Sequence, residues 1–185
     1  MAIPEHVTLI EVGPRDGLQN EPHFVPSEQK IELINQLSQT GLKNIEVTSF
    51  VSPKAIPQMA DNAAVFQAID KPQNINFSAL VPNLEGLTQA LKTGLTHIAV
   101  FTAASNTFNQ RNINCSIKES IERCKRVIEE AKQHQLHIRA YISCVLGCPY
   151  EGRISPKQVM FVTEQLLALG VDEISFGDTI GVGTP

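Results

Sequence analysis

The chain has 185 residues, of which 42% are hydrophobic and 18% charged, and this balance excludes a disordered chain or a coiled coil. A formal net charge of −4 without a basic run argues against nucleic acid as a partner. No apolar run reaches the length of a membrane span, and strand-like sequence begins by Val7, so we expect a cytoplasmic protein with no signal peptide and no membrane partner.

Four cysteines are present, at positions 115, 124, 144 and 148. Cys144 and Cys148 are separated by three residues, and no second close pair matches them. The histidines show no spacing typical of metal ligands. The pattern favours reduced, partly buried thiols over a zinc site or a disulfide.

Apolar, β-branched runs alternate with amphipathic helical patterns along the whole chain. The predicted strands are residues 7–12, 44–48, 76–81, 97–101, 137–143 and 173–176. Helical periodicity is clearest over residues 27–40 and 116–133. Capping signals support two helix starts, a Ser116–Glu119 capping box and a Ser155-Pro156 start followed by Gln158.

A weak internal repeat reinforces this alternation. Residues 41–47, 94–100 and 170–176 each begin with a helix-ending glycine, followed by an apolar residue, a short turn and a strand. One βα unit is therefore used repeatedly, which predicts a parallel sheet covered by helices.

Two architectures fit this pattern, an open doubly wound sheet and a (β/α)8 TIM barrel. No glycine-rich phosphate loop follows the first predicted strand, which disfavours the nucleotide-binding open sheet. Unusual polar residues follow the carboxyl ends of strands, where barrel enzymes carry their chemistry. These residues are Arg15, Asp16, Glu46, Ser49 and Asp178.

A closed barrel needs eight strands, and the pattern supplies six. We therefore predict one α/β domain over residues 1–185, an incomplete (β/α) barrel truncated after about six βα units. Its two apolar edge strands would invite pairing with another chain.

Arg15 and Asp16 place a permanent cation beside a carboxylate directly after the first apolar run. The guanidinium can hold an anionic or enolate oxygen, and the carboxylate can bind a metal or a proton. The competing interpretation is a surface ion pair in a turn. Glu46 is either a functional acid or the ion-pair partner of Arg15, and the roles of Ser49 and Arg139 stay open.

Five segments together resemble the 3-hydroxy-3-methylglutaryl-CoA lyase family. They are residues 13–21, 46–53, 112–116, 144–152 and 177–185. The Arg-Asp-Gly-x-Gln core is shared with homocitrate and isopropylmalate synthases, whereas Leu-Gln-Asn-Glu and Cys-Pro-Tyr-Glu-Gly are more specific to the lyase.

The resemblance implies cleavage of 3-hydroxy-3-methylglutaryl-CoA to acetyl-CoA and acetoacetate with Mg²⁺ or Mn²⁺, in leucine catabolism. By resemblance, Asp16 is a metal ligand, and Arg15 contacts the substrate carbonyl and stabilises the enolate. Asp178 and Glu46 match catalytic acids of the family.

Gln19 and Asn112 fall in substrate-binding segments, with Asn112 on the side of the CoA. The expected partner is an acyl-CoA substrate, and a homo-oligomer is compatible with the family.

The family completes its metal site with a His-x-His pair and an asparagine, and it carries a reactive loop cysteine. None of these occurs in the 185 residues. Because a hard divalent cation takes about six oxygen ligands, we expect the chain alone to have little lyase activity. The alternatives are a non-catalytic fragment that assembles with a complementary piece, and a sister aldol-type acyl-CoA condensing enzyme.

Overall fold

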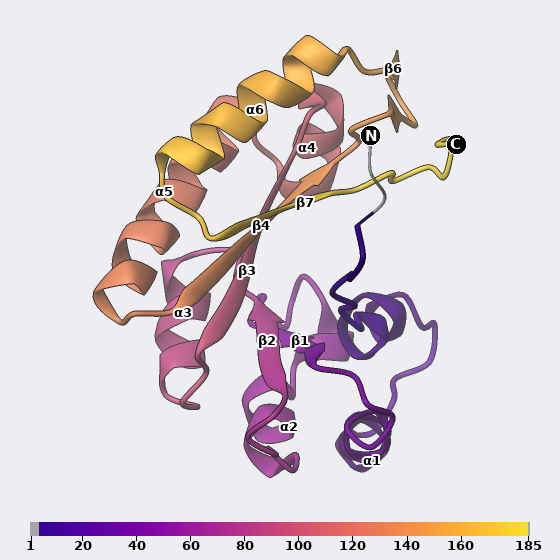
Figure 1. The fold of residues 1–185 in the computed structure, drawn as a ribbon, viewed down its shortest axis with the longest axis vertical. Helices are drawn as coiled ribbons and strands as arrows, with labels where there is room; N and C mark the ends of the chain where they lie inside the picture. Colours follow the sequence, from indigo (N-terminus) through magenta and orange to yellow (C-terminus); the bar gives the residue numbers. More distant parts are fainter. Residues whose placement is uncertain (1–3, 185) are drawn as a thin grey trace. The chain divides into compact units, whose positions relative to one another are not determined.

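The computed structural model describes residues 4–184 (Figure 1). The chain forms two compact units. The first unit contains residues up to 80 together with 88–97, and the second contains residues 81–87 and 98 onward. The organisation of residues 1–185 as a single domain stays a prediction.

Among the described residues, two short strands form the hairpin described below, and five longer strands carry the sheet structure of the two units. They are β1 (Asn44–Ser49), β2 (Asn76–Leu80), β3 (His97–Ala103), β4 (His137–Ser143) and β7 (Glu173–Phe176). β1 pairs with β2 in parallel, and β4 pairs with β7 in parallel. Each of these strands overlaps a predicted one, so the predicted α/β alternation is confirmed.

The prediction of a strand over residues 7–12 is wrong. This segment forms a single parallel bridge between Glu11 and Ile45. The carbonyl of Leu9 accepts a hydrogen bond from the side chain of Asn44, 3.4 Å away, where a ladder would use a main-chain amide. The side chains of Val7 and Leu9 are 74% and 66% exposed. The apolar run therefore lacks the buried face that stabilises a strand.

In the first unit, α1 (Ser27–Leu37) and α2 (Asn62–Ala68) pack together, and η2 (Pro57–Met59) is a short 3-10 turn before α2. The helix predicted over residues 27–40 ends at Leu37. Hydroxyl groups at its end donate to helix carbonyls, from Ser38 to Ile34 and from Thr40 to Leu37, and they compete with continuation of the helix.

The second unit contains α4 (Asn106–Ile113), α5 (Ile117–Gln133) and α6 (Pro156–Ala168). Both predicted caps are confirmed, because Ser116 forms the full capping box with Glu119 and the Ser155 hydroxyl accepts from the Gln158 amide. A short antiparallel hairpin, β5 (Gly147–Cys148) with β6 (Gly152–Arg153), was not predicted. α3 (Leu84–Leu91) lies between β2 and β3 in the sequence.

The repeated glycines have the backbone geometry that the repeat requires. Gly41, Gly94 and Gly170 have φ values of 93°, 77° and 79°, in the left-handed region that an L side chain rarely adopts. Each glycine ends a helical segment and leads into β1, β3 or β7. Among the described residues, no helix has both the length and the apolar character needed to cross a membrane.

Candidate active site around Arg15

The Arg15-Asp16 pair lies in a π-helical turn, Gly13–Gly17, which follows the Glu11 bridge directly. The amide of Leu18 donates to the carbonyl of Gly13, five residues back, as a π-turn requires. Pro14 fits the first turn, where no amide proton is needed. π-turns are rare and frequently mark functional sites, so this turn sets the pair apart from an ordinary surface loop.

Glu11 holds the start of this turn. Its carboxylate Oε1 accepts a hydrogen bond of 2.6 Å from the amide of Gly13. A Cβ at Gly13 would meet the same oxygen at 2.7 Å, below the range that real Cβ atoms show. A side chain at this position would therefore displace the Glu11 carboxylate from its contact with the Gly13 amide.

Arg15 is held between two carboxylates. Its Nε lies 2.5 Å from Glu46 Oε1, and its Nη1 lies 2.5 Å from Asp16 Oδ1. The side chains of Arg15 and Glu46 are 10% and 1% exposed, whereas that of Asp16 is 57% exposed. Pairing with Arg15, one of the two interpretations of Glu46, is therefore confirmed. Two charge-assisted contacts fix the guanidinium, and the three groups together carry one net negative charge.

An irregularity in β1 directs a second side chain to the face that carries Glu46. The register between β1 and β2 shifts between Glu46 and Thr48, so that Glu46 pairs with Ser78 and Ser49 pairs with Leu80. Because Ser78 and Leu80 are two residues apart on one strand, Glu46 and Ser49 lie on one face of the sheet. The Thr48 hydroxyl contacts Met59 at 3.7 Å instead. Bulges commonly re-aim side chains next to active sites.

Ser49 is buried, and its hydroxyl has no hydrogen-bond partner among the described residues. Its main-chain carbonyl accepts from the side chain of Asn62 at 3.0 Å. The sequence left the role of Ser49 open, and the register now places it on the face of Glu46.

Gln19 lies half-buried in the helical turn that follows Gly17, in the same unit as Arg15. Asn112 and Asp178 belong to the second unit, in which Asn112 is exposed on α4. The structure therefore brings Arg15, Asp16 and Glu46 into direct contact within one unit.

Asp178 follows β7 and is exposed. Its Oδ2 accepts a hydrogen bond of 2.7 Å from the amide of Gly183, and its carbonyl accepts from Gly181. The neighbouring hydroxyl of Thr179 accepts from the amide of Cys144 at 2.8 Å. Asp178 thus orders the turn after β7 and keeps an exposed carboxylate.

The residues between β5 and β6 form a polar contact with α4 that sequence reasoning missed. Glu151 Oε1 accepts from the amide of Thr107 at 2.6 Å. Hydrogen bonding to the Thr107 side chain, and then to this amide, lowers the pKa of Glu151. The guanidinium of Arg111 lies 4.1 Å from the centre of the Tyr150 ring. The Cys-Pro-Tyr-Glu-Gly run contained this signal, but spacing alone could not show that its acid reaches a helix start 44 residues away.

All four cysteines are free and buried in the structure. Burial raises the pKa of Cys144 to about 11 and that of Cys124 to about 12. Burial also opposes ionisation of Cys148, but hydrogen bonds from Ser105 and from nearby main-chain amides outweigh it and lower the pKa of that thiol. The Ser105 hydroxyl lies 3.1 Å from Cys148 Sγ.

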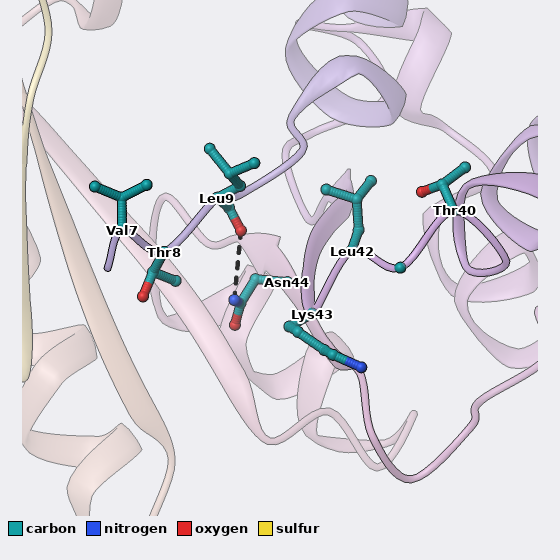
Figure 2. Close-up of a pocket in the computed structure, with 8 residues that line it drawn as sticks. Val7, Thr8, Leu9, Thr40, Leu42, Lys43 and Asn44 are labelled. Atoms are coloured by element: carbon teal, nitrogen blue, oxygen red, sulfur yellow. Dashed lines mark hydrogen bonds between the residues drawn. The ribbon is translucent and has the colours of Figure 1, made fainter. Parts of the chain in front are cut away.

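A cavity of about 610 Å³ lies at the start of β1 and holds none of the predicted site residues. Its lining consists of Val7, Thr8, Leu9 and residues 40–44. Figure 2 shows these side chains with the Leu9–Asn44 hydrogen bond between them. Lys43 is the one ionisable residue in this lining, so the cavity offers no acid–base pair. The candidate chemistry therefore belongs to the Arg15 cluster.

The described residues supply one candidate ligand for a divalent metal. Asp16 provides an exposed carboxylate, the kind of oxygen ligand that Mg²⁺ and Mn²⁺ prefer. Across residues 4–184, no group of three or more His, Cys, Asp or Glu side chains gathers as a metal site. Asp16 therefore fits a metal as one ligand, and further ligands would have to come from water, substrate or other residues.

The family model described as HMGL-like matches residues 6–185. The cytoplasmic 3-hydroxy-3-methylglutaryl-CoA lyase of Rattus norvegicus is 56% identical over 183 residues, which cover 99% of this chain and 53% of the relative. The 3-hydroxy-3-isohexenylglutaryl-CoA/hydroxy-methylglutaryl-CoA lyase of Pseudomonas aeruginosa is 55% identical and is covered to 61%. The chain thus spans about half to three fifths of the length of these relatives.

Solved structures agree with the sequence comparison. The hydroxymethylglutaryl-CoA lyase of Pseudomonas aeruginosa matches all of this chain, and 61% of its own chain, with a TM-score of 0.96. An HMG-CoA lyase from Acinetobacter baumannii, in complex with coenzyme A and 3-methylmalate, matches 96% of this chain and 58% of its own at 38% identity and a TM-score of 0.92. The predicted barrel-type α/β fold class is confirmed, and the chain belongs to the HMGL-like family.

Proposed function

We propose that this chain provides the Arg15 half of a metal-dependent carbon–carbon lyase that cleaves 3-hydroxy-3-methylglutaryl-CoA to acetyl-CoA and acetoacetate. The observation that carries the proposal is the guanidinium of Arg15, buried and fixed between Glu46 and Asp16. The names of the rat and Pseudomonas relatives support the same reaction.

Cleavage next to a thioester leaves negative charge on the thioester oxygen as the enolate forms. A permanently charged guanidinium in a buried site stabilises that charge without reorganising during the reaction. Glu46 holds the Nε side of Arg15, so we assign it the task of orienting the guanidinium. Gln19, on the turn that follows, is the proposed hydrogen-bonding partner of the acyl group.

Asp16 is the proposed metal ligand, with its exposed carboxylate beside Arg15. A bound Mg²⁺ or Mn²⁺ would acidify the tertiary hydroxyl of the substrate. Asp178 is the proposed proton acceptor or relay, because its carboxylate is exposed at the end of β7.

Asn112 is proposed to contact the CoA moiety. The Acinetobacter lyase structure contains coenzyme A, which supports an acyl-CoA partner for the family. We also propose a cytoplasmic location, as in the name of the rat relative, although the bovine relative is named mitochondrial.

The test uses the 185-residue chain and a chimera in which the segment that follows the matched region in the Pseudomonas relative is joined to it. We expect metal-dependent acetoacetate release by the chimera and none above the blank by the 185-residue chain. Arg15→Gln in the chimera should lower kcat by about 10²- to 10³-fold, the cost of removing one oxyanion-stabilising donor.

Arg15→Lys is the matched variant, because it keeps the charge and loses the forked contact with two carboxylates. Arg15→Lys should recover a minor part of the kcat that Arg15→Gln loses. A folded chimera in which Arg15→Gln retains kcat within about threefold would overturn the assignment. Substantial acetoacetate release by the 185-residue chain would overturn the expected dependence on further ligands.

A further inference from the structure

Gln58, in the short turn η2, clamps the loop that follows the Arg15 cluster. Its Oε1 accepts from the amide of Val25 at 2.9 Å, and its Nε2 donates to the carbonyl of His23 at 2.9 Å. A longer contact of 3.5 Å joins the same Nε2 to the carbonyl of Glu21. One buried side chain, 7% exposed, therefore engages the main chain at three positions of a five-residue segment.

The clamp is held by a second buried group. Lys30 is 3% exposed, and its Nζ donates to the main-chain carbonyl of Gln58 and to Asp61 Oδ1, the latter at 2.8 Å. The other oxygen of Asp61 accepts from the Ser27 hydroxyl at 2.7 Å. Burying an ammonium group has a large desolvation cost, which is offset only by such a complete set of partners.

The segment that the clamp fixes is itself exposed. Residues 21–24 are exposed, and Phe24 is 58% exposed although its ring lies 4.8 Å from the Lys30 ammonium. The same connection carries Arg15, Asp16 and Gln19 a few residues earlier. An exposed loop ordinarily remains mobile, whereas here a buried network orders its main chain and leaves its side chains accessible.

We propose that Gln58 is a positioning residue, which orders residues 21–25 in advance as one wall of the acyl-CoA site. This inference rests on the function proposed above. Fixing a binding loop before the ligand arrives lowers the entropy cost of binding. Arg15 is held independently by Glu46 and Asp16, so loss of the clamp should weaken substrate binding and leave the chemical step intact.

The first measurement needs no activity. Amide hydrogen exchange in the 185-residue chain is compared for wild type, Gln58→Leu and the control Gln36→Leu, which removes an exposed amide on α1. We expect exchange at Val25 to accelerate about tenfold in Gln58→Leu, because its hydrogen-bond acceptor is lost. The control should match wild type. Unchanged exchange at Val25 would show that no clamp operates.

The second measurement uses the chimera described above. Gln58→Leu should raise KM about five- to tenfold with kcat within about twofold, the pattern of lost uniform binding. Faster exchange at Val25 with unchanged KM would overturn the proposal that residues 21–25 form a wall of the acyl-CoA site. Gln58 would then have a purely structural role. A fall in kcat with unchanged KM would also overturn it.

If the wild-type chimera has no lyase activity, the proposed function fails while the clamp remains testable. The Kd for coenzyme A, measured by calorimetric titration, then takes the place of KM as the measure of binding. The expected result is a Kd about five- to tenfold higher for Gln58→Leu than for wild type and Gln36→Leu. Equal affinities of the variants for coenzyme A, or no binding of coenzyme A to the wild-type chain, would overturn the proposal that residues 21–25 form a wall of the site.

Discussion

Glu46 in the first unit and two carboxylates in the second unit have opposite environments. In the first unit, Glu46 is buried and pairs with the charged side chain of Arg15. In the second unit, Glu151 and Asp178 are exposed, and each accepts from a main-chain amide across a loop. Removing one partner of a buried charge pair lowers stability strongly, because the other partner is left charged and desolvated. Removing an exposed acceptor costs little, because water can replace it. The first unit should therefore be the less tolerant of mutation.

The sharpest test of this comparison is Glu46→Ala. We expect it to lower the free energy of unfolding by about 3 to 5 kcal/mol, because Arg15 remains buried without this partner. Urea unfolding followed by circular dichroism measures the change. The control is Glu173→Ala, which removes the partner of Arg139 from a pair whose carboxylate side chain is 42% exposed. Glu173→Ala should lower the free energy of unfolding by less than about 1 kcal/mol. Equal losses would break the comparison.

Two serine-to-alanine changes compare buried hydroxyls. Ser120 donates to the Ile117 carbonyl and contacts Thr102 and Asn109, so its removal should cost about 1 to 3 kcal/mol. Ser49→Ala should be neutral or stabilising by up to about 1 kcal/mol, since its hydroxyl has no partner among residues 4–184. Unfolding midpoints in urea distinguish the two. A loss above about 1 kcal/mol for Ser49→Ala would indicate a partner that the hydroxyl acquires in solution.

Gly13→Ala and Gly17→Ala form a matched pair within the π-turn. The first places a methyl group 2.7 Å from Glu11 Oε1 and should cost about 1 kcal/mol, because the carboxylate must release the Gly13 amide. The second meets no atom within 4 Å and should leave stability unchanged or slightly raised. Thermal unfolding of the two variants gives the difference. Equal stabilities would show that the Glu11 contact contributes nothing.

The smallest expected effect is the acid response of the Glu151 contact. The hydrogen bond from Thr107 lowers the pKa of Glu151 below its ordinary value of 4.5. Its contribution to stability is therefore complete above pH 4.5 and is lost as the pH falls through the lowered value. Hydrogen exchange at the start of α4, followed from pH 6 downward in wild type and Glu151→Gln, measures it. Wild type should be better protected at pH 6, and the difference should shrink in acid.

Five of the six predicted strands are present because their apolar faces are buried where the periodicity places them, as at Ile45, Ile98 and Ile138. The same reasoning failed for residues 7–12, because an apolar run shows only that a segment can pair, and pairing depends on a neighbour elsewhere in the chain. The capping serines at 116 and 155 were predictable since a cap depends on residues within one turn.

Part of the candidate site was also predictable. Arg15 and Asp16 stood out as charges after an apolar run, and pairing with Arg15 was one of two interpretations of Glu46. The bulge that places Ser49 on the face of Glu46 could not be predicted, because it is a property of the register between two strands. The same holds for Gln58, whose partners lie more than 30 residues away and include main-chain atoms that no motif records.

The π-turn at Gly13–Gly17 also limits which insertions and deletions this region can accept. A π-turn contains one residue more than the corresponding α-turn, and each helical residue turns the chain by about 100°. Deleting one residue here would restore an α-turn and swing the guanidinium away from Glu46. The length of this segment is therefore as strongly constrained as its amino acids, and homologues with a gap at this point should have lost the chemistry of the pair.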